Sequence, residues 1–102
     1  MVVVVFRSRL RQGVDEHTLL KLGERMYELA SVMPGCISYK DFTAADGENV
    51  SIVEFQSPET LAAWRDHPEH RVARQRGRDE FFSEYRIQVC TLDRDYGTAR
   101  TP

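Results

Sequence analysis

At 102 residues the chain has room for one domain and not for two. A hydrophobic fraction of 41% and a charged fraction of 29% are ordinary for a soluble globular domain, and the formal net charge of -2 gives no positive field that would favour nucleic acid or an anionic membrane. The apolar start of the chain meets Arg7 after six residues, which is too short for a signal peptide or a membrane span, so we expect a cytoplasmic protein.

The first predicted elements are a strand and a helix. Four consecutive valines open a strand over residues 2–10, and such a run of β-branched residues is typical of a strand buried on both faces. Over residues 15–32 apolar residues recur at intervals of three and four, which predicts an amphipathic helix. Pro34 cannot continue this helix and Gly35 is free to turn, so we expect the helix to end before them.

A β-hairpin is predicted next. Residues 36–42 alternate Ile37 and Tyr39 with polar side chains, as a strand with one buried face does. The dipeptide Asp46-Gly47 is a strong hairpin signal. We therefore expect residues 50–56 to return antiparallel to the preceding strand.

The second half of the chain predicts a broken helix and a last strand. Ser57 is suited to cap a helix N-terminus, and Pro58 suits the first helical position. Pro68 interrupts this helix, because proline lacks an N–H group and clashes with the preceding turn. A second helical segment is expected to end at Gly77, and the last strand is predicted over residues 82–93.

The resulting βαββαβ order predicts an α+β fold of the ferredoxin-like kind. Its four-stranded antiparallel sheet has the spatial order 4-1-3-2, with both helices on one face. Cys36 and Cys90 then lie on opposite edge strands, too far apart for a disulfide within one chain. No element is left to cover the other face of the sheet, so we expect a homodimer that buries it.

The segment 61–78 holds the only Trp, two of the three His and five Arg. Trp64 fits either the core or the wall of a pocket. His70 fits either a solvated surface position or a base, because the start of a helix favours the neutral imidazole. On a regular helix, six residues leave the two side chains about 120° from alignment, so a shared pocket requires a kink at Pro68.

The remaining charged residues of this segment predict a solvated helix face. Its arginines alternate with acidic residues, which disfavours nucleic-acid binding, although Arg71 or Arg74 is suited to hold an anionic substrate. His67 and His70 have the spacing of metal ligands, but Pro68 breaks the geometry and no third ligand is near, so we expect no metal.

The stretch "AAWRDHPEHRVARQRGRDEFFSEYRIQVC", followed by "RDYG", resembles the antibiotic biosynthesis monooxygenase (ABM) family. The resemblance extends back to "VVVVFRSRL", and implies a single ABM-like domain over residues 1–102 that forms a dimeric α+β barrel. Residues 97–102 are expected to be a poorly ordered tail.

Two characterised branches of that family provide functional expectations. Cofactor-independent oxygenases convert anthrone-type phenols to quinones with O2, and their pocket Trp matches Trp64. Their phenolic or basic residue six positions later matches His70, whereas their Asn four positions before the Trp is Thr60 here. Haem-degrading relatives use an axial His and an Asn on the first strand, which fall on Arg74 and Phe6 and thus disfavour haem degradation.

The resemblance therefore implies a cofactor-free monooxygenase acting on an electron-rich phenol, with O2 as co-substrate. His70 would deprotonate the substrate and Trp64 would form an apolar wall. The substrate site would be completed by Arg71, Arg74, Phe82 and Tyr85. A non-enzymatic ligand-binding dimer, or an isomerase or decarboxylase acting on a related aromatic, remain alternatives.

The sequence does not decide on which side of the sheet the large aromatic residues lie. Tyr39, Phe55, Phe82 and Tyr85 fit either the barrel interior or the core beneath the helices. No Gly-rich phosphate-binding loop and no Ser-His-Asp or Cys-His grouping is present, so a flavin or nicotinamide site has no support.

Overall fold

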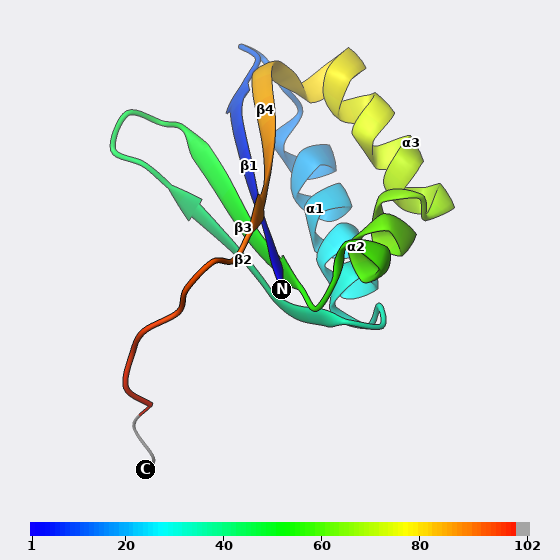
Figure 1. Cartoon of the computed structure of the whole chain (residues 1–102). Helices are drawn as coiled ribbons and strands as arrows, with labels where there is room; N and C mark the ends of the chain where they lie inside the picture. The colour runs from blue at the N-terminus through cyan, green and yellow to red at the C-terminus, as the bar shows by residue number, and fades with distance from the viewer. Residues whose placement is uncertain (100–102) are drawn as a thin grey trace.

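A computed structural model describes residues 1–99 as one layer of strands and one layer of helices (Figure 1). The elements, in chain order, are β1 (Val2–Leu10), α1 (Glu16–Ser31), β2 (Cys36–Thr43), β3 (Asn49–Phe55), α2 (Pro58–Arg65), α3 (Pro68–Arg76), η1 (Gly77–Phe81) and β4 (Phe82–Thr91). The predicted α+β class and the βαββαβ order are confirmed, with the second helix divided at the predicted proline.

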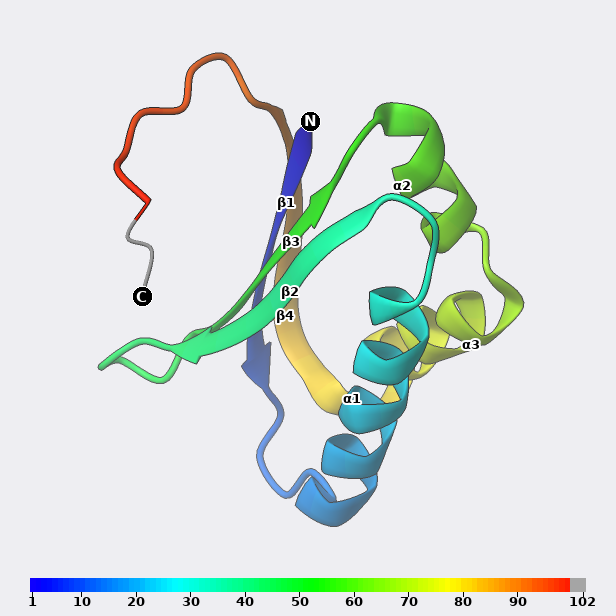
Figure 2. The same cartoon turned by 90° about the horizontal axis from the view of Figure 1, so that it is seen from below.

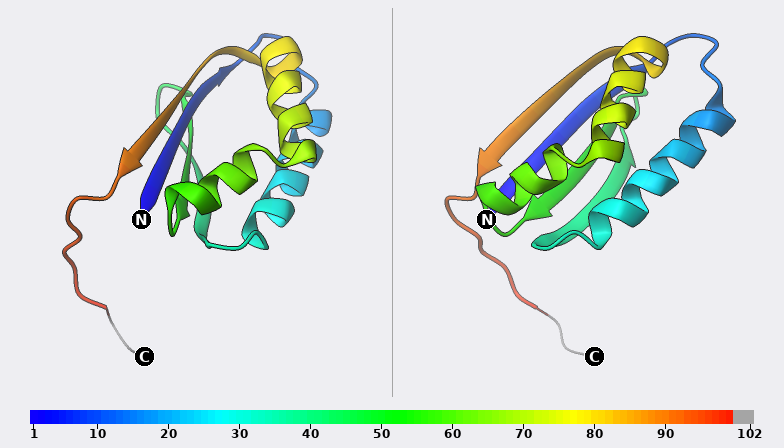
Figure 3. Two further views of the ribbon diagram at one scale, coloured as in Figure 1. Left: turned by 45° about the vertical axis from the view of Figure 1, so that its right-hand side comes forward. Right: turned by 90° about the vertical axis from the view of Figure 1, so that its right-hand side faces the viewer.

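The four strands form one antiparallel sheet in the order β2-β3-β1-β4. This is the predicted ferredoxin-like order, with β1 in the centre. All three helices lie on one face of the sheet (Figures 2 and 3). The chain after β4 leaves the sheet on the side away from the helices (Figure 1). No helix of residues 1–99 is long and apolar enough to cross a membrane.

The helix starts follow from local side-chain hydrogen bonds. The Asp15 carboxylate accepts the backbone N–H of Thr18 at 3.1 Å and so begins α1. At the start of α2 the Ser57 hydroxyl accepts the N–H of Thr60, whose own hydroxyl accepts the N–H of Ser57. Pro68 starts α3, where its missing N–H costs nothing because the first turn has no acceptor for it.

The core lies between the sheet and the helices. Its buried members come from both layers: Val2, Met26, Ala30, Val53, Phe55, Trp64 and Ala73. Phe55 is fully buried, which assigns this aromatic residue to the core beneath the helices. Burial of these apolar side chains is the main stabilising term for the arrangement of the two layers.

Of two local expectations, the one for Ile37 is wrong and the one for Gly77 is confirmed. Ile37 was expected on the buried face of its strand, but its side chain is 50% exposed. The register of β2 against β3 shifts between Cys36 and Ser38, so Ile37 does not follow the inward–outward alternation of the strand. Gly77 follows the last residue of α3 and caps it as expected, but its φ of -57° is right-handed, and the chain continues through the π-helical turn η1. A Cβ at Gly77 would lie 2.6 Å from the Phe82 ring, so close packing explains the glycine.

The face of the sheet without helices carries apolar side chains. Strand alternation places Val3, Val5, Phe42, Val50 and Ile52 on it, and each is half-buried or exposed. The expected burial of the first strand on both faces is therefore not reached within residues 1–99 of one chain. We call these five side chains the outer apolar patch.

The two cysteines lie on the edge strands, Cys36 on β2 and Cys90 on β4, and both are free thiols. This agrees with the expectation that they do not pair. Burial raises the pKa of the Cys36 thiol, so this thiol stays protonated at neutral pH. Residues 97–99 form neither helix nor strand, and the rest of the expected tail, 100–102, lies outside the described residues.

Candidate functional site

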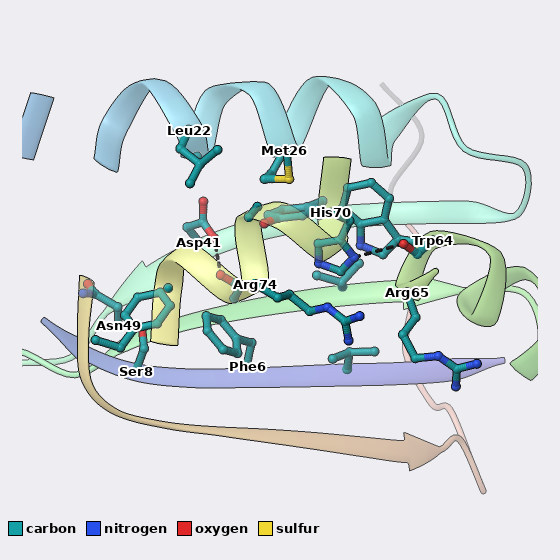
Figure 4. A pocket seen from close by; sticks show the side chains of 18 of the residues that line it. Phe6, Ser8, Leu22, Met26, Asp41, Asn49, Trp64, Arg65, His70 and Arg74 are labelled. Atoms are coloured by element: carbon teal, nitrogen blue, oxygen red, sulfur yellow. Dashed lines mark hydrogen bonds between the residues drawn. The ribbon is translucent and has the colours of Figure 1, made fainter. Parts of the chain in front are cut away.

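A cavity of about 550 Å³ lies between the sheet and the helices (Figure 4). Its floor is formed by the side chains of β1 that point toward the helices: Val2, Val4, Phe6, Ser8 and Leu10. Helix α1 contributes Leu22 and Met26 from the opposite side. This volume lies within the range of natural small-ligand pockets and the lining is mainly apolar, as in sites that bind organic molecules.

The cavity opens toward the β4 edge of the sheet. Val89 and Thr91 of β4 line it, yet Val89 is 60% exposed. On the same face of β4, Ile87 is 48% and Tyr85 38% exposed. An apolar ligand can therefore reach the cavity past a strand whose inner face is only partly covered.

One wall of the cavity is a stacked pair of rings. Trp64 lies in the last turn of α2, His70 lies in the first turn of α3, and both line the cavity. Their ring centroids are 4.0 Å apart and their planes differ by 9°. The break at Pro68 redirects the chain so that two side chains six residues apart share one wall.

The hydrogen bond of His70 fixes which ring nitrogen carries the proton. Nδ1 lies 3.0 Å from the backbone oxygen of Trp64. A carbonyl oxygen only accepts, so Nδ1 is the protonated nitrogen and Nε2 keeps its lone pair. No group among residues 1–99 hydrogen-bonds to Nε2. His70 thus presents an acceptor on the Trp64 wall of the cavity (Figure 4).

The surroundings of His70 keep its imidazole neutral. Burial lowers the pKa of His70 to about 4, and the positive charge of Arg74 acts in the same direction. The hydrogen bond to the Trp64 carbonyl opposes this lowering, but it is the smaller effect. At neutral pH the side chain is therefore a hydrogen-bond acceptor without a charge.

The lowered pKa of His70 predicts a loss of stability in mild acid. Between pH 6.5 and 4 the unfolded chain binds a proton that the folded chain does not, so stability is complete above that window and falls through it. When the pH is lowered from about 7.5 to about 5, the titration of His70 should reduce the free energy of unfolding by up to about 2 kcal/mol.

Urea denaturation at both pH values measures this loss. The control is His70→Phe, which keeps a flat ring beside Trp64 but does not titrate. Other titrating groups act equally in both proteins, so the parent should lose more than the variant. Equal losses would mean that His70 does not titrate as described.

A second polar group in the cavity is the guanidinium of Arg74. Its Nε is buried and has no hydrogen-bond partner among residues 1–99. The residue lies one helical turn after His70 and lines the same cavity. Arg71, also predicted to bind substrate, is exposed and does not line the cavity, because it lies on the outer side of α3.

The end of the cavity away from Trp64 contains polar residues that the sequence did not single out. Ser8 is 5% exposed, and Asn49, Ser51 and Asp41 line the same end. The Ser51 hydroxyl donates to the Asp41 carboxylate. Strand alternation places these residues on the inner face, and the register of the sheet, which pairs Ser8 with Asn49 and Asp41 with Ser51, brings them together.

Tyr39 also lines the cavity, which assigns this aromatic residue to the inner face of the sheet. Burial raises the pKa of Tyr39 to about 12, and the nearby Asp41 charge adds to the effect. Its phenol is therefore protonated at neutral pH and can donate a hydrogen bond.

The predicted aromatic residues of the last strand divide between the cavity and its margin. Phe82 lines the cavity and makes an edge-to-face contact with Phe6, with ring centroids 5.4 Å apart. Tyr85 is not among the lining residues, although its ring centroid lies 6.2 Å from those of Phe6 and Phe82. The structure thus brings Trp64, His70, Arg74 and Phe82 together, whereas Arg71 and Tyr85 lie outside.

No group of three or more His, Cys, Asp or Glu side chains suited to a metal ion occurs within residues 1–99. The two histidines of the helical break have separate partners: Nδ1 of His67 accepts the backbone N–H of Glu69 at 3.1 Å.

The fold and the cavity define a small α+β domain with a mainly apolar cavity between its two layers, and comparison with known proteins gives its family. The sequence model of the antibiotic biosynthesis monooxygenase (ABM) family matches residues 1–76, so the chain belongs to that family. The uncharacterized protein YqjZ of Bacillus subtilis (strain 168) is 32% identical over 71 residues, which are 70% of this chain and 62% of that protein.

Solved structures share the fold. Rv0793 from Mycobacterium tuberculosis superposes with a TM-score of 0.83 and 23% identity, covering 94% of this chain and 98% of the other. A mutant of SnoaB, a cofactor-independent oxygenase from Streptomyces nogalater, gives a TM-score of 0.77 at 12% identity, covering 92% and 94%.

Proposed function

We propose that this protein oxidises an electron-rich phenol of the anthrone type with O2. The reaction takes place in the cavity between the sheet and the helices. The observation that carries the proposal is the Trp64–His70 wall, where an uncharged imidazole presents Nε2 beside a mainly apolar space. Membership of the ABM family supports a monooxygenase-like or small-molecule-binding role, and the fold is shared with a cofactor-independent oxygenase.

The proposed reaction balances without an added reductant. A ring CH2 group becomes C=O while O2 supplies one oxygen atom to the product and one to water. The substrate itself provides all four electrons that O2 accepts. Removal of the phenolic proton makes the ring a better electron donor, so the protein has to accept that proton and keep bulk water out.

Each role is assigned to a residue of the cavity. His70 Nε2 accepts the phenolic proton, since Nδ1 is engaged by the Trp64 carbonyl. Trp64, which is 4% exposed, forms the flat apolar wall against which the substrate rings lie. Phe82 packs on Phe6 and closes the cavity below the substrate.

Oxygen uptake with anthrone as the probe tests the proposal. The protein should consume one O2 per anthraquinone formed, at a rate well above that of anthrone in buffer alone, and labelled O2 should place one oxygen atom in the new carbonyl. A rate equal to that in buffer would refute oxidation of this substrate class.

One observation favours a second candidate, a ligand-binding protein without catalysis. With a pKa of about 4, His70 is a weak base for a phenol of pKa about 10, and full proton transfer between them is uphill by on the order of 8 kcal/mol. If the protein binds anthraquinone-like molecules but does not accelerate oxygen uptake, this second candidate function is supported.

The proposed active form is a homodimer that buries the outer apolar patch. Ile52→Glu should shift sedimentation at micromolar concentration from dimer to monomer, because a charge would have to be buried at the interface. Val72 of α3 is 61% exposed on the helical side, so Val72→Glu is the matched control and should stay dimeric. A parent protein that sediments as a folded monomer would contradict the dimer.

A further inference from the structure

The Arg74 guanidinium differs from the paired arginines of this chain in what its Nε edge contacts. In four other arginines, Nε and Nη2 donate hydrogen bonds to the two oxygens of one carboxylate. The pairs are Arg7 with Glu48, Arg25 with Glu69, Arg65 with Asp66 and Arg76 with Glu80. Arg74 makes no salt bridge within residues 1–99, and its Nε is buried without a partner. A buried donor without an acceptor is costly unless a ligand supplies one.

Two acidic residues, one that senses the charge of Arg74 and one that lines the same cavity, do not satisfy its Nε. Asp66 lies close enough to sense the charge of Arg74, but its two carboxylate oxygens are held by Arg65 at 3.1 and 3.3 Å. Asp41 lines the cavity but accepts from the Ser51 hydroxyl. The cavity is therefore lined by a guanidinium that no described carboxylate pairs with, and whose Nε has no acceptor within residues 1–99.

The position of Arg74 places this edge beside the aromatic wall. The residue lies one helical turn after His70 on α3, and the close-up shows its guanidinium extending from α3 over β1, below the His70 ring (Figure 4). A ligand whose rings contact Trp64 and His70 would thus have a substituent within reach of Arg74.

We propose that the ligand of this cavity is an aromatic carboxylate, whose carboxylate pairs with the guanidinium of Arg74 while its rings lie against Trp64 and His70. This inference rests on the proposed function for the identity of the site, and it adds the charged group that the ligand must carry. Planar guanidinium and planar carboxylate match in two parallel hydrogen bonds, and the apolar surroundings strengthen the attraction.

A bound carboxylate also changes the electrostatics of His70. The positive charge of Arg74 is one of the causes that lower the pKa of His70. An anion paired with Arg74 offsets that charge, so ligand binding raises the basicity of Nε2 at the moment when a phenolic proton has to be accepted. The carboxylate thus reduces the mismatch between His70 and a phenol.

Isothermal titration calorimetry with 2-naphthoate and 2-naphthamide, two probes of similar shape and different charge, tests the proposal. The parent should bind the carboxylate on the order of 10- to 100-fold more tightly than the amide. Arg74→Gln should remove most of this preference while binding of the amide changes little. Arg74→Lys keeps the charge but lacks Nε, and should retain only part of it.

Arg71→Gln is the matched control, because it removes the same charge from an exposed residue of the same helix and should keep the preference. Circular dichroism of each variant checks the fold. Equal binding of both probes by the parent, binding of neither, or an unchanged preference in Arg74→Gln would each overturn the proposal. Tighter binding of ionised 4-nitrophenol than of the carboxylate, lost in Arg74→Gln, would assign the edge to a phenolate instead.

These measurements require no turnover. A carboxylate preference that depends on Arg74, combined with no oxygen uptake, would refute the oxidation and leave this inference standing. Oxygen uptake with anthrone but no carboxylate preference would refute this inference and leave the proposed oxidation standing.

Discussion

Replacing His70 with alanine is expected to lower the rate of anthrone oxidation by on the order of 100-fold or more, as the loss of a general base does. The variant removes Nε2, the uncharged acceptor that His70 provides on the Trp64 wall. Oxygen uptake under saturating substrate measures the change in kcat. The cavity floor on β1 is untouched, so binding of an aromatic product should weaken much less than turnover.

His70→Gln separates proton acceptance from positioning. Glutamine can accept a hydrogen bond but does not take up a proton near neutral pH. If His70 acts as a base, His70→Gln should be nearly as slow as His70→Ala. A rate close to that of the parent in either variant would mean that another group accepts the proton, or that the protein only binds its ligand.

Replacing Trp64 with alanine is expected to cost about 3–5 kcal/mol of unfolding free energy. The indole is 4% exposed, belongs to the buried core and also lines the cavity, so its removal leaves a void that the neighbouring helices fill only in part. A domain of this size has about 5–15 kcal/mol in total, so the variant should unfold at much lower denaturant concentration.

Trp64→Phe is the control, because it keeps an aromatic ring in the wall and should cost only about 1–2 kcal/mol. In the alanine variant that still folds, the lost burial should also raise the pKa of His70, which NMR titration of the imidazole measures. A loss below about 1 kcal/mol for Trp64→Ala would show that the ring only borders the cavity and does not support the core.

Much of the fold was predictable because its signals are local. The break at Pro68, the Ser57 cap and the turn at Asp46-Gly47 each depend on the chemistry of a few adjacent residues, and all three occur as expected. The strand order followed from the βαββαβ order, since few connections are possible in so short a chain. The error at Ile37 arises from a register shift between β2 and β3, which depends on the pairing of two strands.

The candidate site was predictable in part for the same reason. Trp64 and His70 were selected by residue type and by resemblance to a family, and their functional roles stay predictions. The Nδ1 contact with a backbone carbonyl, the buried Nε of Arg74 and the position of Arg71 outside the cavity had no sequence signal. Such facts depend on where a side chain points after α2 and α3 pack on the sheet.

The sequence by itself determined most of the elements and their order, because helix caps, strand alternation and turn residues act over short distances. The family was indicated separately, by resemblance. Only the tertiary structure decided which side chains share the cavity and what charge each carries. Burial and neighbouring charges set the pKa of His70, and both depend on contacts between residues far apart in the chain. Packing of α3 on the sheet buries the His70 ring and leaves the Nε of Arg74 without an acceptor within residues 1–99, and neither fact can be read from the local sequence.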